Sequence, residues 1–157
     1  MFTSKNHQQL YMRKALQEAQ CAFEEEEIPV GAVIVYKGKI IAKAHNQVER
    51  LNDPTAHAEM IAITQAADFL KSKWLHNCTL YVTIEPCSMC AGALILSRIG
   101  RVVFGASDPK TGAFGSRMDI NAFRLNHKIK VKRGILMAEC ANILKDFFKS
   151  KRKKLEH

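Results

Sequence analysis

Two short segments of the chain hold side chains that bind metals or transfer protons. His57 and Glu59 stand in the first, and Cys87 and Cys90 stand in the second. The two cysteines are three residues apart, so on a helix they project from one face, and the N-terminus of that helix favours the thiolate form. Pro86 suits the first turn of such a helix, where its missing N–H costs nothing. One imidazole and two thiolates are the three protein ligands of a catalytic zinc whose fourth position is left to water.

The metal-site prediction has alternatives that the sequence leaves open. A Cys-x-x-Cys pair also occurs in redox proteins and in structural zinc sites, and a histidine at a helix start is often an ordinary polar residue. A fourth ligand from His45 or His76 would turn the site into a structural one. The combination of both segments favours chemistry, because three ligands leave one position for a reacting water.

Glu59 is the candidate acid and base of this site. It lies two residues from His57, close enough to reach a water held by the metal without being a ligand itself. A carboxylate beside such a water takes its proton and delivers it elsewhere. The alternative role is structural, since a glutamate in a first helical turn also complements the helix dipole.

The composition is that of one globular domain rather than a membrane or disulfide-stabilised protein. The 157 residues are 47% hydrophobic and 25% charged, and no apolar run approaches the ~20 residues that span a bilayer. The N-terminus is not signal-like, so we expect a cytoplasmic protein. The five cysteines are odd in number, which argues against a disulfide framework. We expect Cys21, Cys78 and Cys140 to be small core residues.

The net charge of +9 is concentrated at the C-terminus, where residues 149–157 hold five Lys/Arg and one Glu. Such a tail suits nucleic acid, although a solvated helix end explains the charge equally well. Residues 155–157 read as the remnant of an expression tag, so a single domain of residues 1–154 is expected.

The spacing of apolar residues predicts an α/β fold. The first helix has an apolar face and ends near the acidic run of residues 24–27, which we interpret as a solvated helix end; the face comprises Leu10, Ala15, Leu16, Ala19, Ala22 and Phe23. Two β-branched runs, residues 31–36 and 39–44, flank Lys37-Gly38 and predict a hairpin, because glycine accepts positive φ.

Strands and helices then alternate. The expected order is a helix at 55–70 with Thr55 as N-cap, a strand at 80–84, a helix at 87–97, strands at 102–106 and 129–131, and a helix at 139–149 that runs into the basic tail. This alternation after a hairpin implies a mixed sheet with helices on both faces.

The motif His-x-Glu followed by Pro-Cys-x-x-Cys resembles that of the zinc nucleobase deaminases. The chain is similar to the bacterial tRNA-specific adenosine deaminases from about Tyr11 to Phe148. The segments that carry the resemblance are PVGAV at 29–33, Asn46, PTAHAE at 54–59, EPCSMCAGA at 85–93 and VFGA at 103–106. The acidic run at 24–27 and Ser88 depart from the family pattern without touching a catalytic role.

The resemblance implies a cytidine-deaminase-like three-layer α/β/α fold, with a mixed central sheet of about five strands, and a homodimer. It implies conversion of adenosine to inosine at the wobble position of the anticodon of an arginine tRNA. His57, Cys87 and Cys90 would hold one Zn²⁺ per subunit, and Glu59 would move protons. Asn46 would hydrogen-bond the base, and Val30 would help to form the pocket wall. Apart from the resemblance, Ala58 and Cys87 stand at predicted helix starts, so the main-chain N–H of either residue is a candidate to stabilise charge on the reacting oxygen.

An RNA substrate needs an open groove with aromatic and cationic side chains, because the target adenine must leave its stack. The candidates for contacts with tRNA are Ser107, Asp108, Lys110, Phe147, Phe148, Lys151 and Arg152. Asp108 is acidic and suits a turn or a hydrogen bond to sugar or base. Rival functions are a free-base or nucleoside deaminase for guanine or cytosine, and a non-catalytic RNA-binding module stabilised by zinc.

Overall fold

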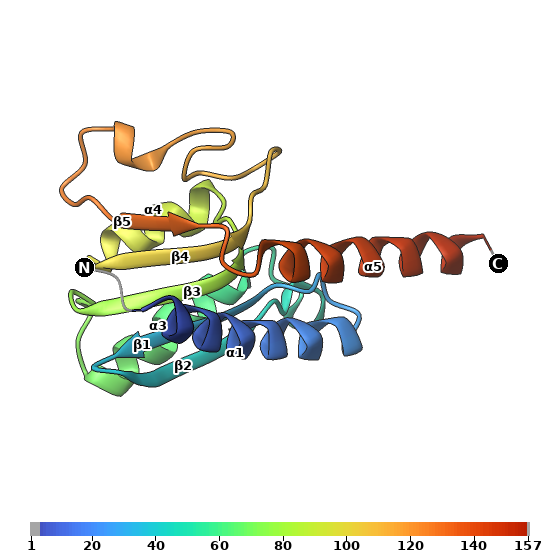
Figure 1. Cartoon of the computed structure of the whole chain (residues 1–157), viewed down its shortest axis with the longest axis horizontal. Helices are drawn as coiled ribbons and strands as arrows, with labels where there is room; N and C mark the ends of the chain where they lie inside the picture. Colours follow the sequence, from blue (N-terminus) through green and yellow to red (C-terminus); the bar gives the residue numbers. More distant parts are fainter. Residues whose placement is uncertain (1–3, 157) are drawn as a thin grey trace.

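The computed structural model describes residues 4–156, and a five-stranded mixed sheet lies at its centre (Figure 1). The strands are β1 Gly31–Tyr36, β2 Lys39–His45, β3 Cys78–Ile84, β4 Arg101–Ala106 and β5 Lys130–Arg133. Their order in the sheet is β2-β1-β3-β4-β5. β1 is antiparallel to both β2 and β3, whereas β3, β4 and β5 are parallel. The predicted mixed sheet is confirmed.

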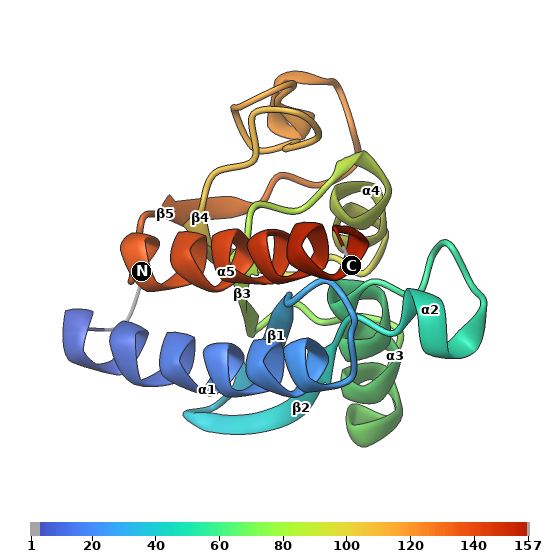
Figure 2. The ribbon, with the colours of Figure 1, turned by 90° about the vertical axis from the view of Figure 1, so that its right-hand side faces the viewer.

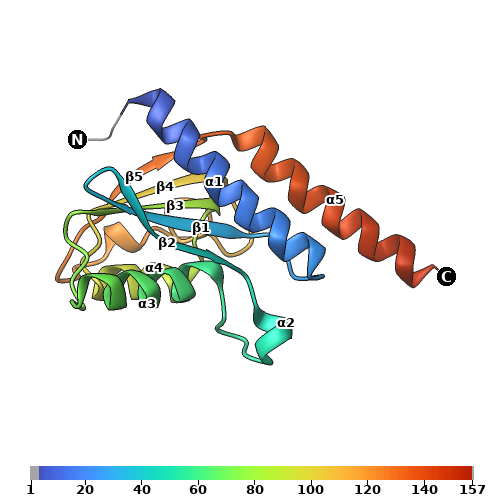
Figure 3. The ribbon, with the colours of Figure 1, turned by 90° about the horizontal axis from the view of Figure 1, so that it is seen from below.

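Helices cover both faces of the sheet. They are α1 Lys5–Glu24, α2 Val48–Leu51, α3 Ala58–Leu70, α4 Ser88–Leu96, the 3-10 helix η1 Ile120–Ala122 and α5 Met137–Leu155. The long helices α1 and α5 lie side by side on one face, and α3 and α4 lie on the other (Figures 2 and 3). This is the expected three-layer α/β/α arrangement. Within residues 4–156, none of the helices has both the length and the apolarity that crossing a bilayer requires.

The hairpin and the sheet follow from local sequence. Lys37 and Gly38 both have positive φ, 50° and 74°, the combination that matches the twist of a two-residue hairpin. Along β1 the side chains alternate between faces, so that Ile34 joins the core under α3 and α4, whereas Val33 joins the core under α1 and α5. Because β1 is buried on both faces, its sequence is an almost continuous run of apolar residues.

Close backbone contact sets the position of α1. A Cβ at Gly31 would stand 1.9 Å from the carbonyl oxygen of Ala15, so only glycine allows α1 to lie this close to β1. The buried face of the helix comprises Gln8, Tyr11, Met12, Ala15, Ala19 and Ala22. Leu10, predicted to be on this face, is exposed, and Cys21, predicted to be a core residue, is exposed as well. Both side chains point away from the sheet, because the buried face of α1 is formed by their neighbours in the sequence, Tyr11 and Ala22.

Several predicted boundaries were wrong by a few residues. The helix expected from Thr55 starts at Ala58, because the Asp53 carboxylate accepts hydrogen bonds from the N–H and the hydroxyl of Thr55 and holds a turn there. α5 extends to Leu155, so the basic tail is helical rather than appended to a helix. α2 and η1 were not predicted, because segments of four and three residues carry no readable period. Of the suspected tag residues, His157 lies outside the described part of the chain.

Candidate active site

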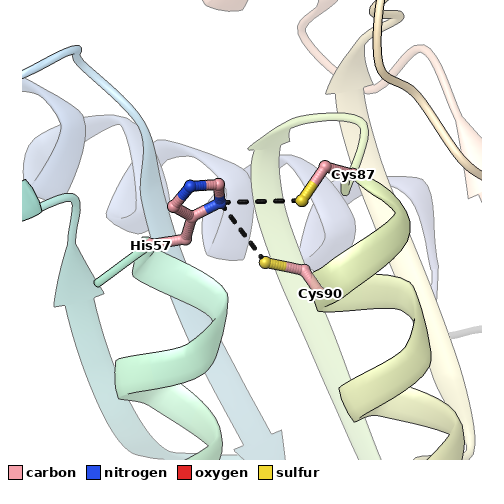
Figure 4. A group of neighbouring side chains, drawn as sticks. All are labelled: His57, Cys87 and Cys90. Carbon is pink, nitrogen blue, oxygen red and sulfur yellow. Dashed lines mark hydrogen bonds between the residues drawn. The ribbon is translucent and has the colours of Figure 1, made fainter. Parts of the chain in front are cut away.

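The starts of two helices bring the predicted metal ligands together. His57 is the N-cap of α3, Cys87 is the N-cap of α4, and Cys90 stands in the first turn of α4. Neither cap side chain bonds to the backbone of its own helix. Figure 4 shows the three side chains pointing toward one another across the gap between the helices.

The three ligand atoms converge on one point. His57 Nδ1 lies 3.7 Å from Cys87 Sγ and 3.5 Å from Cys90 Sγ, and all three atoms lie within 4.8 Å of one another. Nδ1 is therefore the ring nitrogen that faces the site. In residues 4–156 this is the one group of His, Cys, Asp or Glu whose geometry could hold a metal ion. His45 is not part of it, since its ring lies against Glu18 and Glu25.

Hydrogen bonds within this group change the pKa values of all three side chains. The hydrogen bond with Cys90 lowers the pKa of the Cys87 thiol to about 4, and the His57 ring adds to the effect. The same hydrogen bond, together with burial, raises the pKa of Cys90. Hydrogen bonding to Cys87 raises the pKa of His57. One thiolate is thus present at neutral pH, and a metal ion that binds both thiolates would release the Cys90 proton.

Glu59, the second residue of α3, is only 3% exposed. Burial raises its pKa to about 7, which keeps the carboxyl near the point of titration at neutral pH. A group with such a pKa both accepts and returns a proton with little cost. Its side chain lines the same pocket as His57 and Cys87. The pocket therefore combines a metal-binding group with an acid or base.

The pocket beside the metal ligands has a volume of about 140 Å³, smaller than the 300–1,000 Å³ typical of drug-sized ligands. The structure places four predicted residues in its wall: Val30, Asn46, Ala58 and Asp108. Asn46 is held in place by its own N–H, which donates to the carbonyl oxygen of Val30 at 3.1 Å. Sequence reasoning missed four other wall residues, namely Ile28, Ile84, Glu85 and Thr111.

A larger groove of about 770 Å³ adjoins this pocket and shares Ile28, Asn46 and His57 with it. Of the residues predicted to contact RNA, Phe147 and Lys151 line the groove. Phe147 is buried, however, and its ring packs edge-on against Phe23.

The other predicted RNA contacts lie on the surface. Phe148 is 44% exposed, and Ser107, Lys110 and Arg152 are also exposed. The Asp108 carboxylate accepts hydrogen bonds from the N–H groups of Lys110 and Thr111, which is the turn role expected for it. The structure thus places Asp108 in the pocket wall and Phe147 and Lys151 at the groove. The other predicted contacts lie on the exposed surface, namely Ser107, Lys110, Phe148 and Arg152.

The prediction of a solvated helix end is correct for Glu24, Glu25 and Glu26, which are exposed, and wrong for Glu27, which is buried. Glu25 lies against His45 and Arg50, and Glu26 pairs with Lys154 of α5. Glu27 is 1% exposed, and its two oxygens accept the N–H groups of Glu49 and Arg50 at 3.0 and 2.8 Å. Glu25 and Glu26 are thus paired with other side chains, and Glu27 is held by backbone N–H groups.

Comparison with known proteins agrees with this site. A family model described as MafB19-like deaminase matches residues 5–152. The tRNA-specific adenosine deaminase of Bacillus subtilis (strain 168) is 49% identical over 147 residues, which are 93% of this chain and 91% of the relative. A solved structure from work on A-to-I editing by tRNA:A34 deaminases at the wobble position of transfer RNA has a TM-score of 0.80 and 42% identity, covering 86% of this chain and 99% of that one.

A guanine deaminase from Bacillus subtilis is also similar, with a TM-score of 0.60 and 41% identity, but over only 62% of this chain and 63% of its own. The match to the tRNA-specific enzymes is longer and reaches both terminal helices. Because that likeness extends over nearly the whole length at about half identity, the chain is a deaminase and belongs to the tRNA-specific adenosine deaminase family.

Proposed function

We propose that this protein is a zinc-dependent deaminase that converts adenosine to inosine at the wobble position of a tRNA anticodon, with arginine tRNA as the substrate. The observation that carries the proposal is the convergence of His57, Cys87 and Cys90 beside the buried Glu59, in a small pocket that opens into a groove. Family membership supports the tRNA substrate.

Zinc is the ion that this donor set fits. Two thiolates and one imidazole are soft and borderline ligands, which suit zinc and not magnesium or calcium. Three protein ligands also match a catalytic rather than a structural site, since no further histidine or cysteine joins the group in residues 4–156. When bound, zinc would lower the pKa of a water in its open position to about 7.

Glu59 would carry the protons of the reaction. Deamination adds the oxygen of water to C6 of adenine and breaks the bond between C6 and the exocyclic nitrogen, which leaves as ammonia. One proton of the water goes through Glu59 to N1, and the second goes through Glu59 to the departing nitrogen. A buried carboxyl whose pKa is raised in the metal-free protein suits both transfers, because it can act as a base and then as an acid.

The pocket wall would orient the base. Asn46 offers an amide for the polar edge of the adenine, and Val30 offers an apolar contact to its face. The N–H of Ala58 is the first of α3, so it has no acceptor within its own helix and is free to face developing negative charge on the reacting oxygen. The N–H of Cys87 at the start of α4 is the second candidate for that role.

The rim and the C-terminal helix would hold the RNA. Lys151 lies at the groove, and its ammonium stands over the ring of Phe147. Phe148 and Arg152 follow on the same helix, and Ser107 and Lys110 stand on the loop after β4, near Asp108. These side chains suit stacking and phosphate contact. A single catalytic domain of residues 1–154, a homodimer and a cytoplasmic location complete the proposal, supported by family membership.

The test is incubation of zinc-loaded protein with the anticodon stem-loop of an arginine tRNA, followed by digestion and mass spectrometry for inosine. Wild type should give inosine at the wobble position, and Glu59→Ala should give none. Inosine from neither protein would favour a non-catalytic zinc-stabilised module, and equal amounts of inosine from both would remove Glu59 from the proton transfers.

A free-base deaminase is the second candidate, favoured by the likeness to guanine deaminase. It predicts ammonia release from guanine or cytosine and no dependence on the basic helix. Removal of residues 149–154 should abolish activity on RNA if the first proposal is correct. Unchanged activity on RNA after this truncation would contradict it.

A further inference from the structure

The carboxylate of Glu85 is buried at the end of β3, two residues before Cys87, and is only 2% exposed. Its Oε1 accepts the N–H of Asp108 at 3.1 Å and the hydroxyl of Ser116. Its Oε2 accepts the N–H of Phe114 at 2.9 Å and that of Ser116 at 3.2 Å. All four donors belong to a single loop, residues 107–117.

No cation balances this charge. In residues 4–156 no ion pair involves Glu85, so loop donors alone compensate the carboxylate. Burial raises the pKa of the Glu85 carboxyl, but the hydrogen bond from Ser116 and those from the three N–H groups outweigh it, so the pKa lies below its ordinary value. A buried carboxylate of this kind is stable only while its donors stay in place.

The loop is shaped to close around this carboxylate. A Cβ at Gly112 would stand 2.4 Å from the Glu85 carboxyl carbon, so no larger residue allows this approach. The N–H of Ala113 donates to the carbonyl oxygen of Pro86 at 2.9 Å, and Gly112 pairs with Cys87 in an isolated β-bridge. The loop is thus attached to the same three residues that lead into the metal-binding helix.

The loop also supplies part of the pocket wall, namely Asp108 and Thr111. The rest of the pocket wall stands on the segments that flank β1, β2 and β3 and at the starts of α3 and α4, and the loop packs against the same core through the buried Ala113 and Phe114. We propose that Glu85 is a positioning residue for deamination: its carboxylate fixes the loop of residues 107–117 against the Cys87 segment, and so sets the distance between the pocket rim and the reacting groups. The inference deepens the proposed function and rests on it.

Glu85→Gln is the first variant, because the amide keeps the shape but replaces one acceptor oxygen with a donor. With the loop released, the rim should bind substrate poorly while the metal ligands and Glu59 stay in place. We expect KM for the anticodon stem-loop to rise tenfold or more, kcat to change less than about threefold, and the zinc content to stay at one per chain. Ser116→Ala, which removes one of the four donors, should change KM in the same direction by less.

Gly112→Ala tests the same contact without changing any charge, since its methyl group would stand 2.4 Å from the Glu85 carboxyl carbon and 2.6 Å from the carbonyl oxygen of Asp108 in the loop. The double variant with Glu85→Gln should have nearly the same KM as either single variant, because each releases one and the same loop. Glu139→Gln, an exposed change at the start of α5, is the matched control and should behave as wild type. Additive effects of Glu85→Gln and Gly112→Ala would overturn the proposal.

Hydrogen exchange of residues 107–117 provides a readout that does not need activity. The loop should exchange at least tenfold faster in Glu85→Gln than in wild type, while α3 and α4 keep their protection. If wild type makes no inosine, the proposed function fails, and the exchange data still decide the role of Glu85. Unchanged loop exchange, or a loss of activity that follows zinc loss at constant KM, would show that Glu85 supports folding only. If Glu85→Gln does not fold, Ser116→Ala and Gly112→Ala decide by the same measurements.

Discussion

Burial of Glu59 makes the stability of the metal-free protein depend on pH. The pKa of this carboxyl rises from 4.5 to about 7 on folding because the group loses contact with water. A raised pKa means that the folded state holds the proton more tightly than the unfolded chain does. The contribution of Glu59 to stability is therefore most favourable below pH 4.5, becomes less favourable as the pH rises from 4.5 to about 7, and stays at the lower level above that.

The substitution Glu59→Gln removes this penalty. A shift of about 2.5 pKa units corresponds to about 3 kcal/mol, at 1.36 kcal/mol per unit. At pH 8 the metal-free variant should therefore be more stable than metal-free wild type by up to about 3 kcal/mol, and at pH 5 by far less. For a chain of this size the gain corresponds to roughly 6 to 12 °C in the unfolding temperature.

Unfolding by urea at pH 5, 6, 7 and 8, in the presence of a chelator, measures the difference between the two curves. Titrating groups away from Glu59 are common to both proteins and cancel in the difference, whereas His57 and Cys90 interact with its charge and contribute to the difference. Glu85→Gln is the matched control, because hydrogen bonds keep the pKa of Glu85 below its ordinary value and its loss should destabilise the fold at every pH in this range. Parallel curves for wild type and Glu59→Gln from pH 5 to pH 8 would refute the argument.

Three further changes test other parts of the structure. Cys90→Ser removes one thiolate, so the zinc content measured by atomic absorption after dialysis should fall from one per chain to nearly none, and full retention would contradict the ligand assignment. Lys151→Gln should lower the slope of log affinity for tRNA against log salt by about 1, measured by filter binding, and an unchanged slope would remove this side chain from the RNA contact. Gly31→Ala places a methyl group against the Ala15 carbonyl and should cost about 1 to 3 kcal/mol in urea unfolding. Gly92→Ala meets no atom within 4 Å and should stabilise α4 by about 0.5 to 1 kcal/mol, so equal effects of the two substitutions would contradict the packing described for α1.

The convergence of His57, Cys87 and Cys90 near Glu59 was predictable from the sequence because each half of the group is local. His57 and Glu59 are two residues apart, and Cys87 and Cys90 are three residues apart. Patterns this short can be recognised in a sequence without knowledge of the fold. The mixed sheet was predictable for a similar reason, since β-branched runs and helical periods alternate along the chain. The predicted ends of helices and strands were less accurate. For example, α3 was expected to start at Thr55, but the Asp53 carboxylate holds Thr55 in a turn before the helix begins.

The buried carboxylates were not predictable. Glu27 bonds to backbone N–H groups more than twenty residues away, and Glu85 bonds to donors at similar separation. A backbone N–H has no signature in a sequence, so neither partner set could be read from residue types. One signal was available for Glu85: a charged residue that directly follows an apolar strand and precedes Pro86 suggests a buried acid with dedicated donors.

The two helix starts at the metal group have a consequence for how such a sequence drifts over generations. His57 and Cys87 occupy N-cap positions yet leave their helices uncapped, whereas Ser, Asp or Asn at an N-cap adds about 1 kcal/mol. The metal binding proposed for His57 and Cys87 therefore conflicts with helix stability at these two positions. In a descendant that no longer needed the activity, substitutions to Ser or Asn at positions 57 and 87 would be favoured by folding alone, so the site would be lost through mutations that strengthen the protein.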